Sequence, residues 1–169
     1  MGASGPGYSG GGNRVISDAM APDSDRIEEW FPMLRADGYR ITSPRTPVYN
    51  CIAWAAGETH RLWWPTDLRV PGVYWPPDLP RDETLDNFVS AFQALGYSRC
   101  SDGILDVRYE KIALYVDSHG TPTHAARQLE GGAWTSKLGG DADIEHSSPG
   151  GLEDSDYGAV AAYLQRERA

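Results

Sequence analysis

Cys51 directly follows an asparagine and opens the apolar run 51–55, which predicts a short buried helix. Asn50 is a favourable N-cap, and the proline-containing residues 42–48 before it cannot be helical. A thiol in the first turn of a helix lies near the positive end of the helix dipole, which lowers its pKa and favours the thiolate. The pattern therefore predicts cysteine chemistry, with Cys51 as the nucleophile and its backbone N–H as one oxyanion donor.

A histidine much farther along the chain can supply the base that such a nucleophile needs. His124 lies in a strand-like segment whose neighbours Thr123, Arg127 and Gln128 make it unusually polar for a structural core. A base of this kind takes the thiol proton and is itself oriented by a third group. We expect His124 to be the general base; the simpler alternative is a core histidine hydrogen-bonded to the backbone.

The next predicted strand offers that third group. Under the two-residue alternation of a strand, Ser136 shares a face with Trp134 and Leu138, so it would be buried and would need a hydrogen-bond partner. His124 on the neighbouring strand is the candidate partner, which makes Ser136 the third predicted catalytic residue. Lys137 points to the other face, either as a substrate-binding residue or as part of a solvated surface.

Aromatic residues gather in the predicted cysteine helix and in the long, proline-rich loop 58–80 that follows it. A loop of this length is typical of a functional segment or a lid. Its indoles either fold over the cysteine helix as a small satellite core or line a cleft with their N–H groups as polar handles. Together with Asn50, these indoles form the predicted substrate-binding set: Trp54, Trp63, Trp64 and Trp75.

Glu145 and His146 invite comparison with a metal site, to which His60 and His119 could add ligands. No pair has a recognised ligand spacing, and the chain has no phosphate loop or dinucleotide fingerprint. We therefore expect no metal and no other cofactor. Glu145 and His146 are predicted to support the catalytic residues through hydrogen bonds.

Composition limits the classes of partner. A net charge of −9 and a pI near 4.8 argue against binding to nucleic acid or to an anionic membrane. No apolar stretch approaches the roughly 20 residues needed to span a bilayer. Cys51 and Cys100 could form a disulfide, but the lack of a signal peptide favours reduced thiols in the cytoplasm. We expect a small-molecule or peptide-like substrate; a protein partner is compatible with the same composition.

The elements that must position these residues follow from periodicity. The glycine-rich residues 1–13 predict a disordered tail, and residues 14–169 a single domain. A helix over residues 24–34 would bury Trp30, Phe31 and Leu34. Further helices are expected over residues 84–95 and 157–166. An antiparallel meander is predicted between them, with its strands at residues 110–116, 123–129 and 133–138.

Four segments of the chain resemble an uncharacterised family of small bacterial proteins: Asn50-Cys51-Ile52-Ala53-Trp54-Ala55, residues 123–127, residues 134–139 and residues 144–146. The resemblance covers most of residues 45–165. The plan of that family resembles the papain-like cysteine hydrolases, including the bacterial cell-wall amidases. It implies an α+β fold in which a cysteine-bearing helix packs on a small antiparallel sheet, closed by a C-terminal helix. It also implies a hydrolase or acyltransferase that acts on an amide or thioester through an acyl-enzyme.

The chain departs from the amidase pattern at the base. In those enzymes the histidine opens the first strand of the hairpin, a position that falls near Lys111 here, and His124 stands where the orienting group would be. Either the base has moved to His124, or the catalytic set is incomplete. An incomplete set would leave a non-catalytic binding or interaction module with the aromatic loop as its surface. A third alternative is an accessory enzyme that uses the thiol for group transfer.

Overall fold

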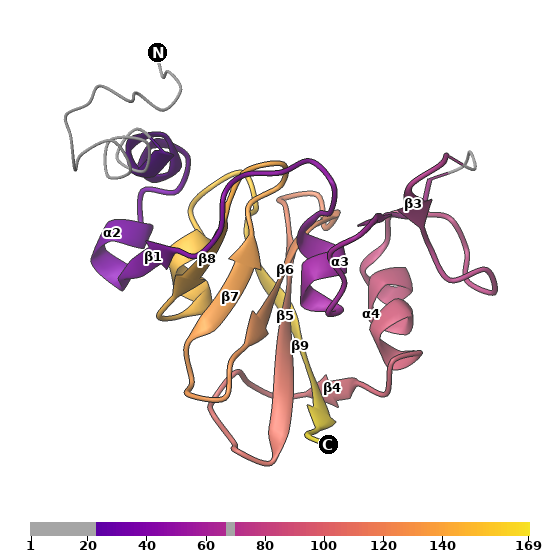
Figure 1. Ribbon diagram of the computed structural model, residues 1–169. Helices are drawn as coiled ribbons and strands as arrows, with labels where there is room; N and C mark the ends of the chain where they lie inside the picture. Colours follow the sequence, from indigo (N-terminus) through magenta and orange to yellow (C-terminus); the bar gives the residue numbers. More distant parts are fainter. Residues whose placement is uncertain (1–22, 67–69) are drawn as a thin grey trace.

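The computed structural model describes residues 23–66 and 70–169 (Figure 1). The predicted tail, residues 1–13, lies outside the described residues, as do residues 14–22 of the predicted domain. In the part of the chain that is described, no helix has the length and apolar composition needed to cross a membrane.

The fold is built on a seven-stranded antiparallel sheet with the strand order β1-β8-β7-β6-β5-β9-β4. A separate parallel pair joins β2 (Leu62–Trp63) to β3 (Val73–Tyr74). The strands of the large sheet are β1 (Tyr39–Ile41), β4 (Ser98–Cys100), β5 (Tyr109–Val116), β6 (Pro122–Gln128), β7 (Trp134–Lys137), β8 (Asp143–His146) and β9 (Ala159–Glu167).

The predicted meander is confirmed as β5, β6 and β7. The turn between β5 and β6 is closed by Asp117, whose carboxylate accepts hydrogen bonds from the backbone N–H groups of His119 and Thr121. Such a side-chain acceptor replaces the backbone pairing that the turn residues lose. The hairpin places His124 opposite Tyr115.

The predicted C-terminal helix is wrong. Residues 159–167 form β9, which lies between β5 and β4 and pairs with β5 along most of its length. Alanine-rich sequence favours a helix, but the open edge of β5 offers a full ladder of hydrogen bonds, and Ala162 and Leu164 alternate into the core. The segment 143–146 is also a strand, β8, which pairs with β1.

The helices are short. α4 (Leu85–Gln93) is confirmed, with the Thr84 hydroxyl accepting from the backbone N–H of Asn87 as its N-cap. The expected helix over residues 24–34 is wrong in extent: residues 23–30 are helical, and a separate turn, α2 (Leu34–Asp37), follows. Trp30 does not face the core and is 51% exposed, because Ile27 takes the buried position beside Phe31 and Leu34.

Core residues cover the sheet on both sides. One cluster joins α3 (Cys51–Ala55), α4 and the loop tryptophans to Ile112 and Leu114 of β5. The other joins residues 23–34 and the 3₁₀ helix η1 (Pro149–Leu152) to the intervening β5 residues Ala113 and Tyr115. In Figure 1, α3 and α4 lie on one side of the sheet and the N-terminal helical segment on the other.

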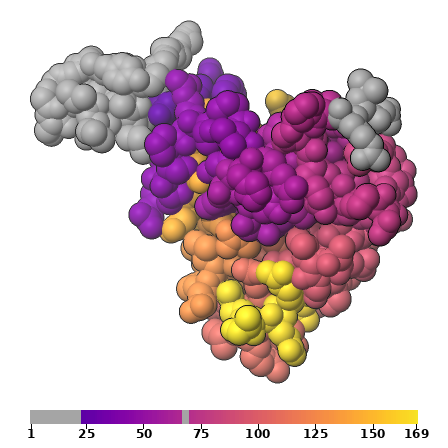
Figure 2. All heavy atoms as spheres, turned by 45° about the vertical axis from the view of Figure 1, so that its right-hand side comes forward, coloured from indigo at the N-terminus to yellow at the C-terminus, as the bar shows by residue number. Residues whose placement is uncertain are grey.

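The papain-like fold class is therefore wrong. The expected arrangement was a cysteine helix on a small sheet with a closing C-terminal helix. The chain instead forms a large antiparallel sheet with a few short helices, and its C-terminal element is a strand of that sheet, between β5 and the edge strand β4. In Figure 2, the segment from about residue 50 to residue 100 forms much of the visible surface of the molecule.

Candidate functional site

Cys51 lies in the first turn of α3, as its sequence context predicts. The Asn50 side chain caps the helix by accepting from the Ala53 backbone N–H at 3.1 Å. β6 pairs with β7 only at Arg127 and Gln128. The earlier part of β6 is therefore free of β7, and Cys51 packs against it, with Sγ 3.9 Å from the Thr123 carbonyl oxygen.

The thiol is held in its neutral form. Cys51 is 5% exposed, and burial raises its pKa to about 11. Hydrogen bonds from the backbone of Ala125, Ile52 and Cys51 itself, and the charge of Lys137, act in the opposite direction but do not compensate. The expected lowering of the thiol pKa by the helix terminus is therefore wrong, because desolvation outweighs the backbone dipoles.

His124 belongs to a buried line of hydrogen bonds that crosses three strands. Its Nε2 lies 3.0 Å from Ser136 Oγ, which lies 2.8 Å from Nε2 of His146. His146 Nδ1 lies 2.8 Å from the carbonyl oxygen of Ser148 and therefore donates to it. The predicted pairing of Ser136 with His124 is present, and His146 extends it.

This line leaves one ring nitrogen of His124 free. Nδ1 is buried and has no hydrogen-bond partner among the described residues. Burial, with a smaller contribution from the charge of His146, holds the His124 pKa well below 6.5. The imidazole is therefore neutral at pH 7 and can accept a proton.

Tyr157 covers the imidazole of His124. The two rings are stacked, with centroids 4.2 Å apart and an interplanar angle of 10°, and Tyr115 packs edge-on against the same imidazole at 5.1 Å. Burial, together with the charges of Cys51 and Asp141, raises the Tyr157 pKa well above 10. Tyr157 is thus within electrostatic reach of the thiol. No local sequence pattern marks it, because the contact joins β6 to a distant loop.

Cys51 packs on one side of β6, whereas the side chain of His124, a residue of β6, lies on the other side. Cys51 belongs to the core cluster of α3, whereas the His124 ring packs against Tyr115 and Tyr157 of the other cluster. Within the described ranges no hydrogen bond joins the thiol to the imidazole. The thiol nevertheless contacts the backbone of the residues on both sides of His124, namely Thr123 and Ala125.

Lys137 is fully buried, so the expectation of a solvated face is wrong. Its ammonium donates to the carbonyl oxygens of Thr46, Gly139 and Asp141 at 2.8, 2.7 and 2.5 Å. It also lies 5.0 Å from the ring centre of Tyr49. Burial lowers the Lys137 pKa, while the charges of Asp143, Asp141 and Cys51 raise it. Lys137 thus holds the loop before α3 to the turn after β7.

Asn50 and Trp54, both predicted to bind substrate, make internal contacts. Asn50 bonds the backbone of Trp63 in both directions, donating to its carbonyl oxygen at 2.9 Å and accepting from its N–H at 3.1 Å. Trp54 donates from its indole N–H to Thr135 Oγ1 at 2.9 Å. These bonds join α3 to β2 and β7.

The aromatic loop packs into the core cluster that contains α3 and α4, so the expected separate satellite core is wrong. Trp63 and Trp75 are 3% and 2% exposed, and Trp64 packs edge-on against Phe88 of α4. The indole N–H groups of these three tryptophans donate to Glu58, to the Pro80 carbonyl oxygen and to Glu83, just after the loop. These indole N–H groups are therefore engaged within the protein and not free for a ligand. Residues 67–69 of the predicted loop lie outside the described residues.

Glu145 does not join the buried line. It faces Arg40 at 3.2 Å in an exposed ion pair on β8 and β1. In the described part of the chain, no cluster of three or more histidine, cysteine, aspartate or glutamate side chains could hold a metal ion. Cys51 and Cys100 are both free thiols.

The comparison with protein families gives one match. Residues 40–165 match a family described as a domain of unknown function (DUF7689), which covers most of the chain and all the candidate residues above. The chain belongs to this family. Neither the curated proteins nor the solved structures gave a match. The DUF7689 domain thus contains Cys51, the histidine line and Tyr157, and its description assigns no activity to them.

Proposed function

We propose that this protein is a cysteine-dependent hydrolase or acyltransferase that acts on an amide or thioester, with Cys51 as nucleophile and His124 as base. The observation that supports this most strongly is the contact of the Cys51 thiol with the backbone on both sides of His124. The same histidine is oriented through Nε2 and keeps Nδ1 free.

The protonation states suit general-base catalysis. When the thiol and the imidazole are both neutral, the base must remove the thiol proton as the sulfur attacks. In the proposed reaction the Cys51 proton moves to His124 Nδ1 while Sγ bonds to the carbonyl carbon. The leaving amine or thiol then takes that proton. His124 next deprotonates water, or an acceptor nucleophile, which cleaves the acyl–sulfur bond and restores the thiol.

The described form is closed. Tyr157 covers His124, and the thiol and imidazole lie on different sides of β6 with no hydrogen bond between them, so the reaction requires Tyr157 to leave the imidazole and the two groups to come together. Catalytic hydrogen bonds are often absent or long in ligand-free enzymes and tighten with substrate. Ser136 and His146 are positioning residues in this scheme, because they act on the reacting atoms only through His124.

We further propose that the substrate is a small or peptide-like molecule rather than nucleic acid, consistent with the net charge of −9. The two free thiols are consistent with a reducing compartment, so we place the reaction in the cytoplasm.

The test is the capture of an acyl-enzyme. In a Cys100→Ser background, the protein is incubated with p-nitrophenyl acetate and with a short acyl thioester, quenched in acid and mapped by mass spectrometry. We expect an acyl group on Cys51, none at this position in Cys51→Ser, and acylation slowed about a hundredfold in His124→Gln. Ser136→Ala keeps the imidazole but loses its orientation, so its loss should be smaller.

A non-catalytic binding module is the second candidate. It is favoured by the burial of Cys51 and its raised pKa. This second candidate would be favoured over the enzyme if Cys51 remained unacylated, or if Cys51 in a folded His124→Gln protein were acylated at the rate of the parent protein.

A further inference from the structure

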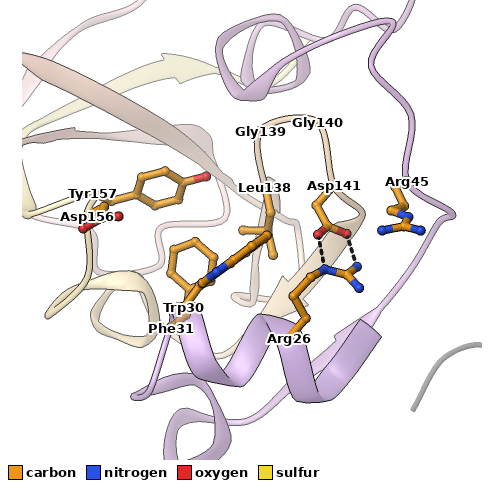
Figure 3. Close-up of a pocket in the computed structure, with 10 residues that line it drawn as sticks. All are labelled: Arg26, Trp30, Phe31, Arg45, Leu138, Gly139, Gly140, Asp141, Asp156 and Tyr157. Carbon is orange, nitrogen blue, oxygen red and sulfur yellow. Dashed lines mark hydrogen bonds and ion pairs between the residues drawn. The ribbon is translucent and has the colours of Figure 1, made fainter. Parts of the chain in front are cut away.

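A pocket of about 510 Å³ opens beside Tyr157, on the side of the sheet that carries the N-terminal helical segment (Figure 3). Its walls come from residues 26–31, the turn after β7 and the loop before β9. This volume is typical of sites for small organic ligands. None of the residues predicted from sequence to bind substrate lines it.

The middle of the pocket is apolar and aromatic. Trp30, Phe31 and Leu138 lie between its two ends, and Tyr157 closes one of them (Figure 3). Trp30, at the end of the helical segment 23–30, is 51% exposed, whereas Trp63 and Trp75 of the aromatic loop are buried. An exposed indole at a pocket wall is suited to cover an apolar ligand body.

The charges of the pocket are separated. Arg26 forms a two-point ion pair with Asp141, with both hydrogen bonds at 3.0 Å, and a further ion pair with Asp23 at 2.6 Å, so these three side chains are engaged with one another. Arg45 and Asp156 are exposed and make no ion pair with any described residue. Figure 3 places Asp156 beside Tyr157 at one end and Arg45 beyond Asp141 at the other. The pocket thus offers one free anion and one free cation, separated by an aromatic wall.

We infer that this pocket binds a small zwitterion of the amino-acid or dipeptide class with an apolar body, its ammonium group at Asp156 and its carboxylate at Arg45. A ligand with both charges matches both free side chains, whereas a simple anion or cation leaves one end unpaired. Its apolar part would lie against Trp30 and Phe31.

The position of Tyr157 connects this pocket to the buried thiol site. One side of its ring stacks on His124, and the residue also lines the pocket. A ligand whose amide reaches Tyr157 would therefore be one ring away from His124. To that extent the inference rests on the proposed function, because it names the substrate class; the binding itself does not depend on catalysis.

The test is isothermal titration of the full chain carrying Cys51→Ser, which removes the chemistry. The probes are L-leucyl-L-phenylalanine, its N-acetyl derivative and its C-terminal amide. We expect saturable binding of the free dipeptide and affinity weakened about tenfold or more for each blocked form. Arg45→Gln should remove the preference for the free carboxylate over the amide, and Asp156→Asn the preference for the free amine.

Arg35→Gln and Asp78→Asn are the matched controls, because both are exposed residues that do not line the pocket and should leave binding unchanged. Absence of saturable binding would overturn the inference, as would binding that is equally tight in Arg45→Gln and Asp156→Asn. Acylation of Cys51 without dipeptide binding would overturn this inference and leave the proposed function standing. Dipeptide binding without acylation would overturn the proposed function and leave this inference standing.

Discussion

The ring of Tyr157 lies parallel to the imidazole of His124 at 4.2 Å and belongs at the same time to the wall of a surface pocket. This places a single aromatic ring between solvent and the buried histidine line. The accessibility of His124 therefore depends on how easily that ring moves.

Removal of the Tyr157 ring should loosen the part of β6 against which the thiol packs. In a Cys100→Ser background, Tyr157→Ala is expected to raise the rate of Cys51 alkylation by iodoacetamide at pH 8 by about tenfold, because the His124 segment that contacts the thiol loses its stacked ring and opens more easily. Tyr157→Phe keeps the stacked ring and serves as the control, with a rate close to that of the parent. Equal rates in all three proteins would show that Tyr157 does not limit access.

The neutral histidine line should make folding sensitive to mild acid. Burial lowers the pKa values of His124 and His146 below 6.5, so the unfolded chain binds more protons than the folded one as the pH falls below 6.5. Stability should be unaffected by these groups above that pH. Below it, stability should decrease by up to about 1.4 kcal/mol per pH unit for each histidine, down to the folded-state pKa.

Urea unfolding at intervals between pH 7.5 and about 5 measures this slope. His124→Gln and His146→Gln should each lose about half of the dependence, whatever their stability at pH 7.5. His119→Gln, an exposed turn residue, should keep the parental slope. A parental protein whose stability does not change over this range would contradict the assignment of neutral, buried imidazoles.

The buried ammonium of Lys137 should be far more important to stability than that of Lys111. Lys137→Met leaves the buried carbonyl oxygen of Asp141 and the carbonyl oxygen of Gly139 without their donor, and we expect a loss of about 3 kcal/mol. Lys111 is also buried, but it bonds Asp102, whose carboxylate is 47% exposed and can turn to water. Lys111→Met should cost about 1 kcal/mol.

Chemical denaturation of the two methionine variants gives the comparison directly. If Lys137→Met matched Lys111→Met, the three-carbonyl contact would be of little energetic importance.

Gly158 should tolerate no side chain. Its φ is +79°, and a Cβ atom there would lie 2.0 Å from the carbonyl oxygen of Val116. Gly158→Ala is therefore expected to displace the start of β9 and the adjacent Tyr157, with a loss of about 3 kcal/mol or more.

Gly120 provides the matched control, since its φ is +81° and a Cβ atom would meet nothing within 4 Å. Gly120→Ala should cost only about 1 kcal/mol, from backbone strain alone. Thermal unfolding distinguishes the two, and a Gly158→Ala protein as stable as Gly120→Ala would show that the loop relaxes freely.

Local sequence was sufficient for the elements with short-range signals. The strands β5, β6 and β7, the helix α4 with its Thr84 cap, and the placement of Cys51 after the Asn50 cap all follow from periodicity and capping, which act over a few residues. The pairing of Ser136 with His124 also follows, because adjacent strands of a meander bring their buried polar side chains together.

Only the tertiary structure decided the rest. Residues 159–167 became β9 because β5 offered an unpaired edge, a fact that no local window contains. The thiol of Cys51 stayed neutral because distant segments of the chain, β6 among them, remove it from water. Arg45 and Asp156 line one pocket because of how the loops before α3 and β9 pack on the sheet. Their spacing along the chain does not predict this.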